Sequence, residues 1–171
     1  MISIKKIISG GQTGVDRGAL ETALEFGFDI GGWCPPHRVA EDGRIPDDLP
    51  LIETPTECSN KAPNVPRSQR TEWNVRDSDA TLILQPNLEN NTDLGTEWTK
   101  TCCIGMDKPF LIYDPFDLDS LSKVVKWLKV VQPKVLTVAG PSETAVPGIQ
   151  EATKTLITAL LSLTTQANKR S

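Results

Sequence analysis

Short runs of apolar residues recur along the chain, and most of them lack the alternation of apolar and polar positions that marks a strand exposed on one face. Uninterrupted runs of this kind are typical of strands buried on both faces of a parallel sheet. They cover residues 4–8, a brief run ending at Ile30, and residues 80–84, 109–113 and 135–139. The pattern therefore predicts a buried strand at each of these places.

Segments with helical periodicity stand between the apolar runs. They cover residues 15–26, 70–75, 95–106, 118–131 and 149–160. The resulting order, in which strand, loop and helix repeat, predicts an α/β fold: an open, doubly wound, mostly parallel sheet with helices on both faces and right-handed crossovers. We expect residues 1–171 to form a single domain, with a frayed polar tail at 164–171.

The first strand ends in a glycine-rich loop, Ser9-Gly10-Gly11-Gln12-Thr13-Gly14, which leads directly into the first helix. Glycines permit positive φ angles and leave room for a ligand beside the backbone. A helix amino terminus offers free N–H groups and the positive end of the helix dipole. The loop is neither a Walker A nor a G-x-G-x-x-G motif, and its alternative interpretation is a tight turn. Its polar residues favour a site for a phosphate or another anion.

Two later strands also end in a glycine turn or a polar loop. Residues 85–95 follow the strand at 80–84, and Gly140-Pro141-Ser142 follows the strand at 135–139. Ligands of open α/β sheets bind beyond the carboxyl ends of the strands, at the point where the strand order reverses. We therefore expect these two edges and the glycine-rich loop to converge on one pocket.

Composition narrows the classes of function. The chain has 171 residues and a net charge of −4, which argues against nucleic-acid binding through bulk electrostatics. No apolar run approaches the ~20 residues of a membrane span, and the first residues lack a signal-peptide pattern, so we expect a cytoplasmic protein. Cys34, Cys58, Cys102 and Cys103 form no C-x-x-C motif, and His37 is the one histidine. This set predicts free thiols rather than a zinc site.

Arginines are concentrated in the first half of the chain, where six lie between Arg17 and Arg76. Their planar guanidinium groups suit bidentate anion binding. Several lie in residues 35–70, a proline-rich stretch that is long for an irregular segment in a compact domain and is therefore interpreted as functional. The alternative is a surface insertion without function. We expect residues 40–50 to be ordered and 59–66 to be looser.

The string Gly-Gly-Gln-Thr-Gly-Val-Asp at residues 10–16 is much more specific than a generic glycine loop. Further distinctive stretches are Gly31-Gly32-Trp33-Cys34-Pro35, Ala40-Glu41-Asp42-Gly43, Ile45-Pro46, Pro50-Leu51-Ile52-Glu53, residues 70–79 and Val138-Ala139-Gly140-Pro141. With these stretches the chain resembles the molybdenum cofactor carrier family over about residues 4–163.

This resemblance implies a Rossmann-like fold related to the phosphoribohydrolases once described as lysine decarboxylases. It implies a homo-oligomer that binds and protects the molybdenum cofactor (molybdopterin), a pterin with a phosphate and a dithiolene-held molybdenum. Because the molybdenum would arrive on the cofactor's own sulfurs, no metal ligand from the protein is required. Molybdoenzymes or cofactor-insertion proteins would receive the cargo.

The chemistry of such a ligand assigns candidate binding residues. Its anionic parts favour backbone N–H groups, a helix amino terminus and arginines, and its ring favours polar edge contacts and a flat apolar partner. The candidate cofactor-binding residues are Gly10, Gly11, Gln12, Thr13, Gly14, Asp16, Arg17, Trp33, Arg38, Asp42, Arg70, Asn74, Asp77, Gly95 and Thr96. Structural alternatives are Trp33 and Trp73 as core, Asp16 as a helix cap, Asp42-Gly43 as a turn, and Arg76 paired with Asp77 or Asp79.

A nucleotide 5′-monophosphate phosphoribohydrolase and a sensor of a nucleotide-derived ligand are the competing interpretations. The related hydrolases carry a Gly-Thr pair and, three residues later, a glutamate that acts at the ribose. Here Thr99 occupies that place, and Glu97 lies about 200° away around the helix. The missing carboxylate favours binding over hydrolysis, and Glu97 or Asp16 is the substitute that hydrolysis would need. The family's Gly-Gly-Thr is also reduced here to Leu94-Gly95-Thr96.

Overall fold

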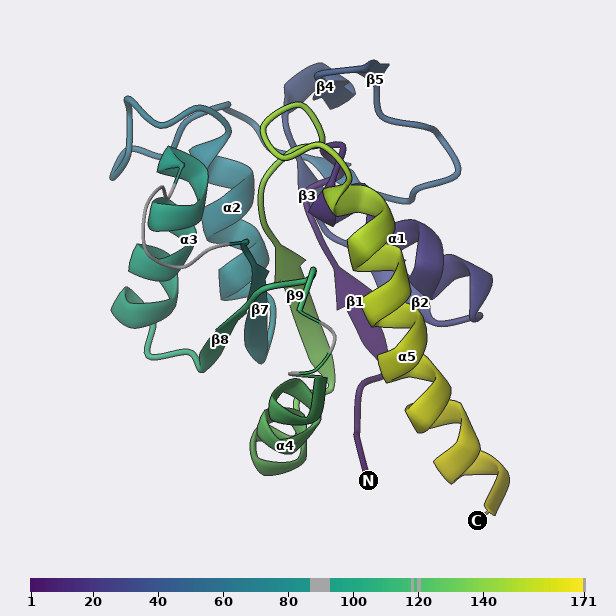
Figure 1. Ribbon diagram of the computed structural model, residues 1–171. Helices are drawn as coiled ribbons and strands as arrows, with labels where there is room; N and C mark the ends of the chain where they lie inside the picture. The colour runs from purple at the N-terminus through teal and green to yellow at the C-terminus, as the bar shows by residue number, and fades with distance from the viewer. Residues whose placement is uncertain (87–92, 118, 120, 171) are drawn as a thin grey trace.

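A parallel sheet forms the centre of the molecule in the computed structural model, which describes residues 1–86, 93–117, 119 and 121–170, with 165–170 described by their backbone alone (Figure 1). Its strands are β1 (Lys6–Ile8), β2 (Asp29–Gly31), β7 (Ala80–Leu84), β8 (Phe110–Tyr113) and β9 (Val135–Ala139). The strand order is β2-β1-β9-β7-β8, and every neighbouring pair is parallel. The predicted α/β fold class is confirmed.

Helices cover both faces of this sheet (Figure 1). They are α1 (Val15–Glu25), α2 (Ser68–Arg76), α3 (Leu94–Gly105), α4 (Leu121–Val131) and α5 (Ile149–Arg170). Buried side chains of α1, α4 and α5 share one hydrophobic cluster with the strands, whereas α2 and α3 meet in another. Leu111 of β8 packs on the first cluster and its neighbour Phe110 on the second. Because successive strand side chains point to opposite faces, the two clusters lie on opposite faces of the sheet.

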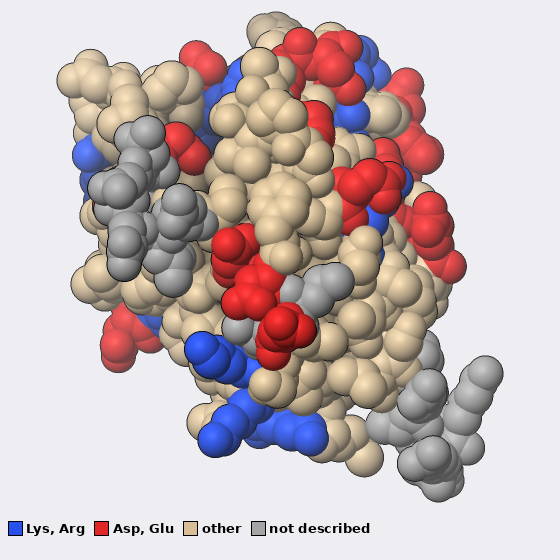
Figure 2. All heavy atoms as spheres, in the orientation of Figure 1, with Lys and Arg blue, Asp and Glu red and all other residues tan. Residues whose placement is uncertain are grey.

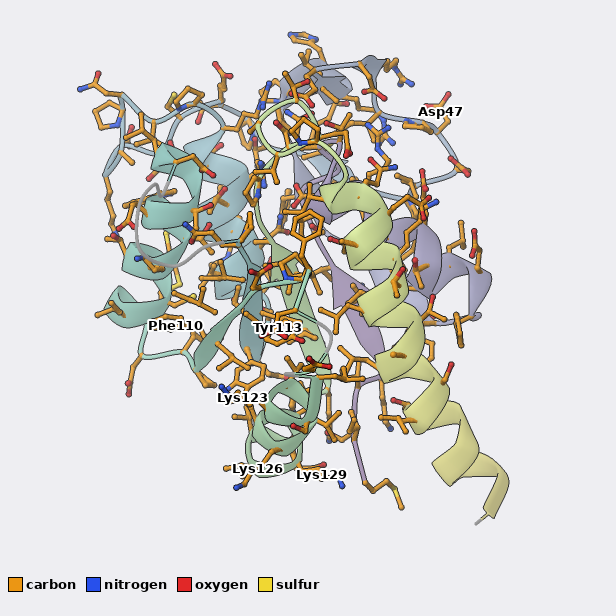
Figure 3. All side chains as sticks on the ribbon, in the orientation of Figure 1. Asp47, Phe110, Tyr113, Lys123, Lys126 and Lys129 are labelled. Carbon is orange, nitrogen blue, oxygen red and sulfur yellow. The ribbon has the colours of Figure 1, made fainter. Side chains whose placement is uncertain are left out.

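Helix α4 illustrates how the apolar pattern places these helices. Val124 and Leu128 are buried in the core, whereas Lys123, Lys126 and Lys129 are exposed. The three lysines project from the outer side of α4 in Figure 3, and Lys and Arg side chains form a group at the same place on the surface in Figure 2. The stripe predicted over residues 118–131 is therefore a core-facing stripe.

Parts of two predicted features lie outside the described residues, namely 87–92 of the polar loop and Leu118 of the stripe. The backbone of α5 is helical as far as Arg170, through most of the stretch that was expected to fray. No described helix combines the length and the apolar composition that crossing a bilayer requires.

The strand order matches a familiar one when the strands are numbered from β9 instead of β1. Starting there and returning to β1, β2, β7 and β8 gives the spatial order 3-2-1-4-5, which is the usual order of dinucleotide-binding sheets. Ile2 and Ile4 near the amino terminus share a cluster with Leu160 and Leu161 of α5, so the two ends of the fold meet. The loop after β9, not the loop after β1, thus occupies the place of the usual first phosphate-binding loop.

The proline-rich segment builds a small layer of its own on α1. The layer begins with β3 (Trp33–Cys34), just before the segment, and continues with η1 (Pro36–Arg38), β4 (Val39–Ala40), β5 (Gly43–Arg44) and β6 (Ile52–Glu53). Strands β3 and β6 pair in parallel, and β4 and β5 form an antiparallel pair. Ile45, Leu49 and Leu51 pack with Leu20 of α1 in a separate buried cluster.

Arg38 holds this layer together from its interior. Its guanidinium donates to four backbone carbonyls, those of Ile45 at 3.3 Å, Leu51 at 3.0 Å, and Pro46 and Leu49 at 2.8 Å each. The stretch 40–50, which was expected to be ordered, is fixed in this way. Arg38 is buried and its donors are used within the protein, so its predicted role in binding a cofactor anion is replaced by a structural one.

The stretch 59–66 is also tied down, in contrast to the looser conformation expected. The N–H of Ser59 donates to the Ser68 hydroxyl at 2.8 Å, and that hydroxyl donates to the Ala62 carbonyl at 2.8 Å. The Ser59 hydroxyl donates to Glu72 of α2. Side-chain bonds to the start of α2 therefore replace regular secondary structure in this segment.

Replacing Arg38 by lysine tests whether its four hydrogen bonds stabilise this layer. A single ammonium cannot reach four carbonyls that lie around a planar fork, so Arg38→Lys should lower the free energy of unfolding by about 2–4 kcal/mol. Arg44→Lys is the matched control, because Arg44 is exposed and pairs with Asp47, which projects from the surface in Figure 3. Urea unfolding of both variants measures the difference. An equal decrease in the free energy of unfolding in the two variants would show that the hydrogen bonds of Arg38 do not hold the layer together.

Candidate functional site

The glycine-rich loop between β1 and α1 packs closely against other parts of the protein. A Cβ built on Gly11, whose φ is +83°, would lie 2.6 Å from Leu51, and one on Gly14, also at +83°, would lie 2.5 Å from the carbonyl of Pro141. A Cβ on Gly10 would lie 2.2 Å from the guanidinium of Arg70. The glycines are thus required because protein groups, rather than a ligand, fill the space beside them.

Several N–H groups of this loop are likewise used internally. Those of Gln12, Thr13 and Gly14 donate to the side chains of Asp16, Gln12 and Gln150, at 3.3, 3.0 and 2.9 Å. The Val15 N–H donates to the carbonyl of Pro141 at 3.2 Å. These four N–H groups are therefore not free for an anion, in contrast to the expectation, because side chains and the neighbouring loop already accept them.

Arg17 was also predicted to bind an anion, but its side chain forms hydrogen bonds within the protein. It is 5% exposed and donates to the carbonyl of Gly11 through Nε and Nη2, at 3.2 and 3.1 Å. It also donates to both carboxylate oxygens of Asp42, at 2.8 and 3.1 Å. These bonds lower the pKa of Asp42. Arg17 and Asp42 therefore clamp the β4–β5 turn onto the glycine-rich loop.

Thr13 and Glu41 extend this clamp to the loop after β9. The Thr13 hydroxyl donates to Glu41 and accepts from the N–H of Glu143 at 3.2 Å. The N–H of Thr144 donates to the same Glu41 oxygen at 3.0 Å. Burial acts to raise the pKa of Glu41, but these hydrogen bonds outweigh it and leave the pKa lowered. Three loops that are distant in sequence are thereby joined.

Asp16 and Arg70 form an ion pair beneath the glycine-rich loop. Asp16 is 1% exposed, and its Oδ2 lies 3.3 Å from Nη1 of Arg70. Oδ1 of Asp16 has no hydrogen-bond partner among the described residues. Burial raises the pKa of Asp16, although Arg70 opposes that shift. Asp16 accepts the Gln12 N–H at 3.3 Å, but the N-cap residue of α1 is Gly14 and no side chain caps this helix. The alternative of Asp16 as a helix cap is therefore wrong, and the residue is the ion-pair partner of Arg70.

Gln12 presents a hydrogen-bond donor of fixed direction. Its Oε1 accepts the N–H groups of Thr13 and Glu41, at 3.0 and 2.9 Å. The amide is therefore oriented, and Nε2 can only donate. That nitrogen is buried and has no hydrogen-bond partner among the described residues, and Gln12 lines a cavity.

This cavity, of about 320 Å³, lies beyond the carboxyl ends of β9 and β7. Its lining residues include Gln12, Arg67, Arg70, Gly95, Thr96, Thr99, Gly140 and Ser142. Helices α5 and α3, which follow β9 and β7, lie on opposite faces of the sheet, so the cavity occupies the switch point of the sheet. Lys or Arg atoms are visible in the recess between the α2–α3 side and the loop after β9 (Figure 2). The three strand ends expected to converge do converge here.

The amino terminus of α3 forms one wall of the cavity, and Asp93 caps it. The carboxylate of Asp93 accepts the N–H of Thr96 at 2.8 Å and its hydroxyl at 2.9 Å. Thr96 therefore has neither group free, in contrast to its expected role as a ligand donor. Gly95 and Thr96 do line the cavity as predicted.

Three predicted ring contacts form a separate cluster outside the cavity. The indole N–H of Trp33 donates to Asp77 at 2.7 Å, and Trp33 packs edge-on against Trp73 at 4.7 Å between ring centroids. Asn74 brackets the backbone of Trp33, accepting its N–H at 2.8 Å and donating to its carbonyl at 3.0 Å. Arg76 pairs with Asp77 at 2.8 Å, as its structural alternative proposed. These side chains are occupied with one another.

Arg67 is the main residue of the cavity that sequence reasoning missed. It lies three positions before Arg70, at the amino-terminal end of α2, and both arginines line the cavity. Residues three apart share one side of a helix, so the Arg-x-x-Arg spacing was the available signal. Arg67 has no carboxylate within 4.0 Å among the described residues, as judged from the ion pairs found there.

Residues 97 and 99 of α3 show whether a carboxylate from this helix reaches the cavity. Thr99 faces the cavity, where its hydroxyl donates to the carbonyl of Gly95 at 2.8 Å. Glu97 is exposed, does not line the cavity and pairs with Lys100 at 2.8 Å. The inference that these two residues point in different directions is thus correct.

Thiol and metal chemistry find little support in the described part of the chain. All four cysteines are free, and burial raises the pKa of Cys102 to about 12 and shifts those of Cys34 and Cys103 upward. No group of three or more His, Cys, Asp or Glu side chains suited to a metal ion occurs among the described residues.

The pKa of Asp16 predicts a pH dependence of stability. A raised carboxyl pKa means that the folded state holds the proton more tightly than the unfolded state, so the contribution of Asp16 to stability falls as pH rises from about 4 through the folded pKa. The free energy of unfolding of the wild type, relative to Asp16→Asn, should therefore decrease between about pH 4 and neutrality. Urea unfolding at a series of pH values measures it.

Asp42→Asn is the control with the opposite sign. Because Arg17 lowers the pKa of Asp42, its contribution is complete above about pH 4 and is lost as pH falls further. A relative stability of the wild type that rises with pH against Asp16→Asn would contradict the assignment of Asp16.

Comparisons with known proteins agree with this topology. A model of the circularly permutated YpsA SLOG family matches residues 7–161. A solved structure of a "putative molybdenum carrier protein" from Syntrophus aciditrophicus SB is similar, with 37% sequence identity, a TM-score of 0.80, and coverage of 91% of this chain and 94% of that one. No curated protein gave a significant match. The order 3-2-1-4-5 obtained by starting at β9 is what a circular permutation of the usual sheet produces, and this chain belongs to the circularly permutated YpsA SLOG family.

Proposed function

We propose that this protein is a non-catalytic carrier that binds and protects the molybdenum cofactor in the cavity beyond the carboxyl ends of β7 and β9. The observation that carries the proposal is Arg67, a half-buried guanidinium that lines a switch-point cavity beside Arg70 without a carboxylate partner among the described residues. Such a cation favours an anionic ligand. The cavity volume lies at the lower end of the ~300–1,000 Å³ typical of ligand pockets. The similar solved protein is named a molybdenum carrier, which supports a molybdenum-containing cargo.

The carboxylates around the cavity favour holding over hydrolysis. Asp93 is engaged by Thr96, and Asp16 is buried behind Arg70. Glycoside cleavage needs a carboxyl group within reach of the reacting atoms. Neither of these two, nor Glu97, is free to approach a ligand in the cavity, and the residue at position 99 is a threonine.

The residues present suit the anionic parts of the cargo. Arg67 and Arg70 would bind phosphate or oxo groups, and Gln12 would donate to an acceptor oxygen. Molybdenum would stay on the dithiolene sulfurs of the cofactor, so the protein need only orient and shield it. The proposal includes a homo-oligomer and delivery to molybdoenzymes or to proteins that insert the cofactor.

A bulky side chain at the exposed rim of the cavity tests whether the cofactor binds there. Ala145 is exposed and lines the cavity, so Ala145→Trp should fill the cavity without disturbing the core. Native mass spectrometry after anaerobic purification should detect the cofactor mass on the wild type and lose it in this variant. Thr158→Trp, on the exposed side of α5, is the control and should retain the cofactor.

The same preparations separate the competing functions. Incubation with AMP should release no ribose 5-phosphate from the wild type. Robust release that disappears in Ala145→Trp would overturn the carrier in favour of a phosphoribohydrolase. A retained nucleotide mass without turnover would overturn it in favour of a sensor.

A further inference from the structure

Arg67 adopts a backbone conformation that its residue type disfavours. It occupies the N-cap position of α2 with φ 59° and ψ 24°, in the left-handed region. Left-handed geometry is unfavourable for a residue with a Cβ, and glycine is the usual occupant. A non-glycine residue held there beside a cavity suggests that its side chain serves a purpose.

The charge of Arg67 is also poorly compensated. Burial lowers the pKa of its guanidinium, and the neighbouring Arg70 lowers it further. Asp16 offers one oxygen to Arg70, 3.3 Å away, and forms no ion pair with Arg67. Two guanidinium groups thus line one cavity. Of the carboxylates nearby, Asp93 is bonded to Thr96 and Asp16 to Arg70, so an additional anion would relieve the repulsion between the two guanidinium groups.

Gln12 supplies an independent observation that points to a ligand. It is 6% exposed, and its Nε2 lacks a partner in the described part of the chain, although Oε1 accepts two backbone N–H groups. A buried donor without an acceptor costs free energy, and an acceptor from a bound molecule would restore the bond. Gln12 lines the same cavity as the two arginines.

We propose that Arg67, Arg70 and Nε2 of Gln12 form a subsite for a tetrahedral dianionic oxyanion, of the kind that a phosphate monoester carries. The two planar forks match oxygen pairs of such a group, and the amide donates to a further oxygen. This inference rests on the proposed function for its cargo, whose phosphate would occupy the subsite. The class of ion is inferred from the residues of the cavity alone, whatever the cargo is.

Arg67→Gly tests the subsite without the usual risk of unfolding. The Arg67→Gly variant should be at least as stable as the wild type, because glycine suits this left-handed position. Its affinity for inorganic phosphate, measured by NMR titration, should be about tenfold or more weaker. Asp107→Gly is the matched control, because Asp107 also has a positive φ, of 53°, but lies beyond the far end of α3 and does not line the cavity. Its phosphate affinity should equal that of the wild type.

Gln12→Glu provides the second variant. A carboxylate can still accept both backbone N–H groups, but it replaces the donor with a negative charge facing the ligand. Phosphate binding should again weaken about tenfold or more while the melting temperature is maintained, since the new charge lies near two arginines. Nitrate, a planar monoanion, should bind the wild type more weakly than phosphate.

The outcomes distinguish this inference from the carrier function. Wild-type phosphate affinity in folded Arg67→Gly and Gln12→Glu would overturn the subsite, even if the wild type retains the cofactor. Loss of phosphate affinity in both variants would support the subsite, even if no cofactor is found on the purified wild type. Nitrate bound as tightly as phosphate would overturn the assignment of a dianion.

Discussion

The buried ion pair between Asp16 and Arg70 is the interaction on which the site depends. It connects α1 to α2 beneath the glycine-rich loop, in space that exists because residue 10 has no side chain. Burying two charges is costly, and well-packed apolar side chains are often as stable as a buried pair. Its geometry is consistent with that cost, since one oxygen of Asp16 and Nε of Arg70 lack hydrogen-bond partners within the described residues. The pair is better explained by what it positions, because it places the guanidinium of Arg70 at the cavity.

Chain order and spatial order differ in this sheet, and the difference decides where the cavity lies. Strand β9 is last in the chain but central in the sheet, between β1 and β7. Its loop packs against the glycine-rich loop, where the carbonyl of Pro141 accepts the N–H of Val15. The glycine-rich loop therefore supports the cavity through Gln12 rather than binding a ligand along its backbone. In a sheet that is not permuted, the loop after the first strand of the chain would itself stand at the switch point.

The sequence was sufficient for the architecture but not for the roles of individual arginines. Buried strands without polar alternation, such as residues 80–84, predict a parallel sheet, and the convergence of strand ends follows from the fold class. Whether a guanidinium is free depends on acceptors that lie far away in sequence. Arg17 finds Asp42, and Arg38 finds four carbonyls, whereas Arg67 finds no ion-pair partner among the described residues. Trp33 and Asp77 were predicted to contact the ring of a cofactor, but their side chains bond to each other outside the cavity.

Unfavourable features are concentrated around the cavity, and this distribution is informative. Five buried side-chain atoms lack hydrogen-bond partners among the described residues, and three of them belong to Gln12, Asp16 and Arg70. Arg67 adds a left-handed backbone and a poorly compensated charge. Proteins tolerate such local conflicts mainly where function requires them. For a holder the requirement is physical: donors that are already fixed and unsatisfied need not abandon other partners when a ligand arrives, so more of their interaction energy remains for binding. The same arrangement places no free carboxylate of the described residues at the ligand, and it is therefore suited to retention of an anion rather than to its chemical change.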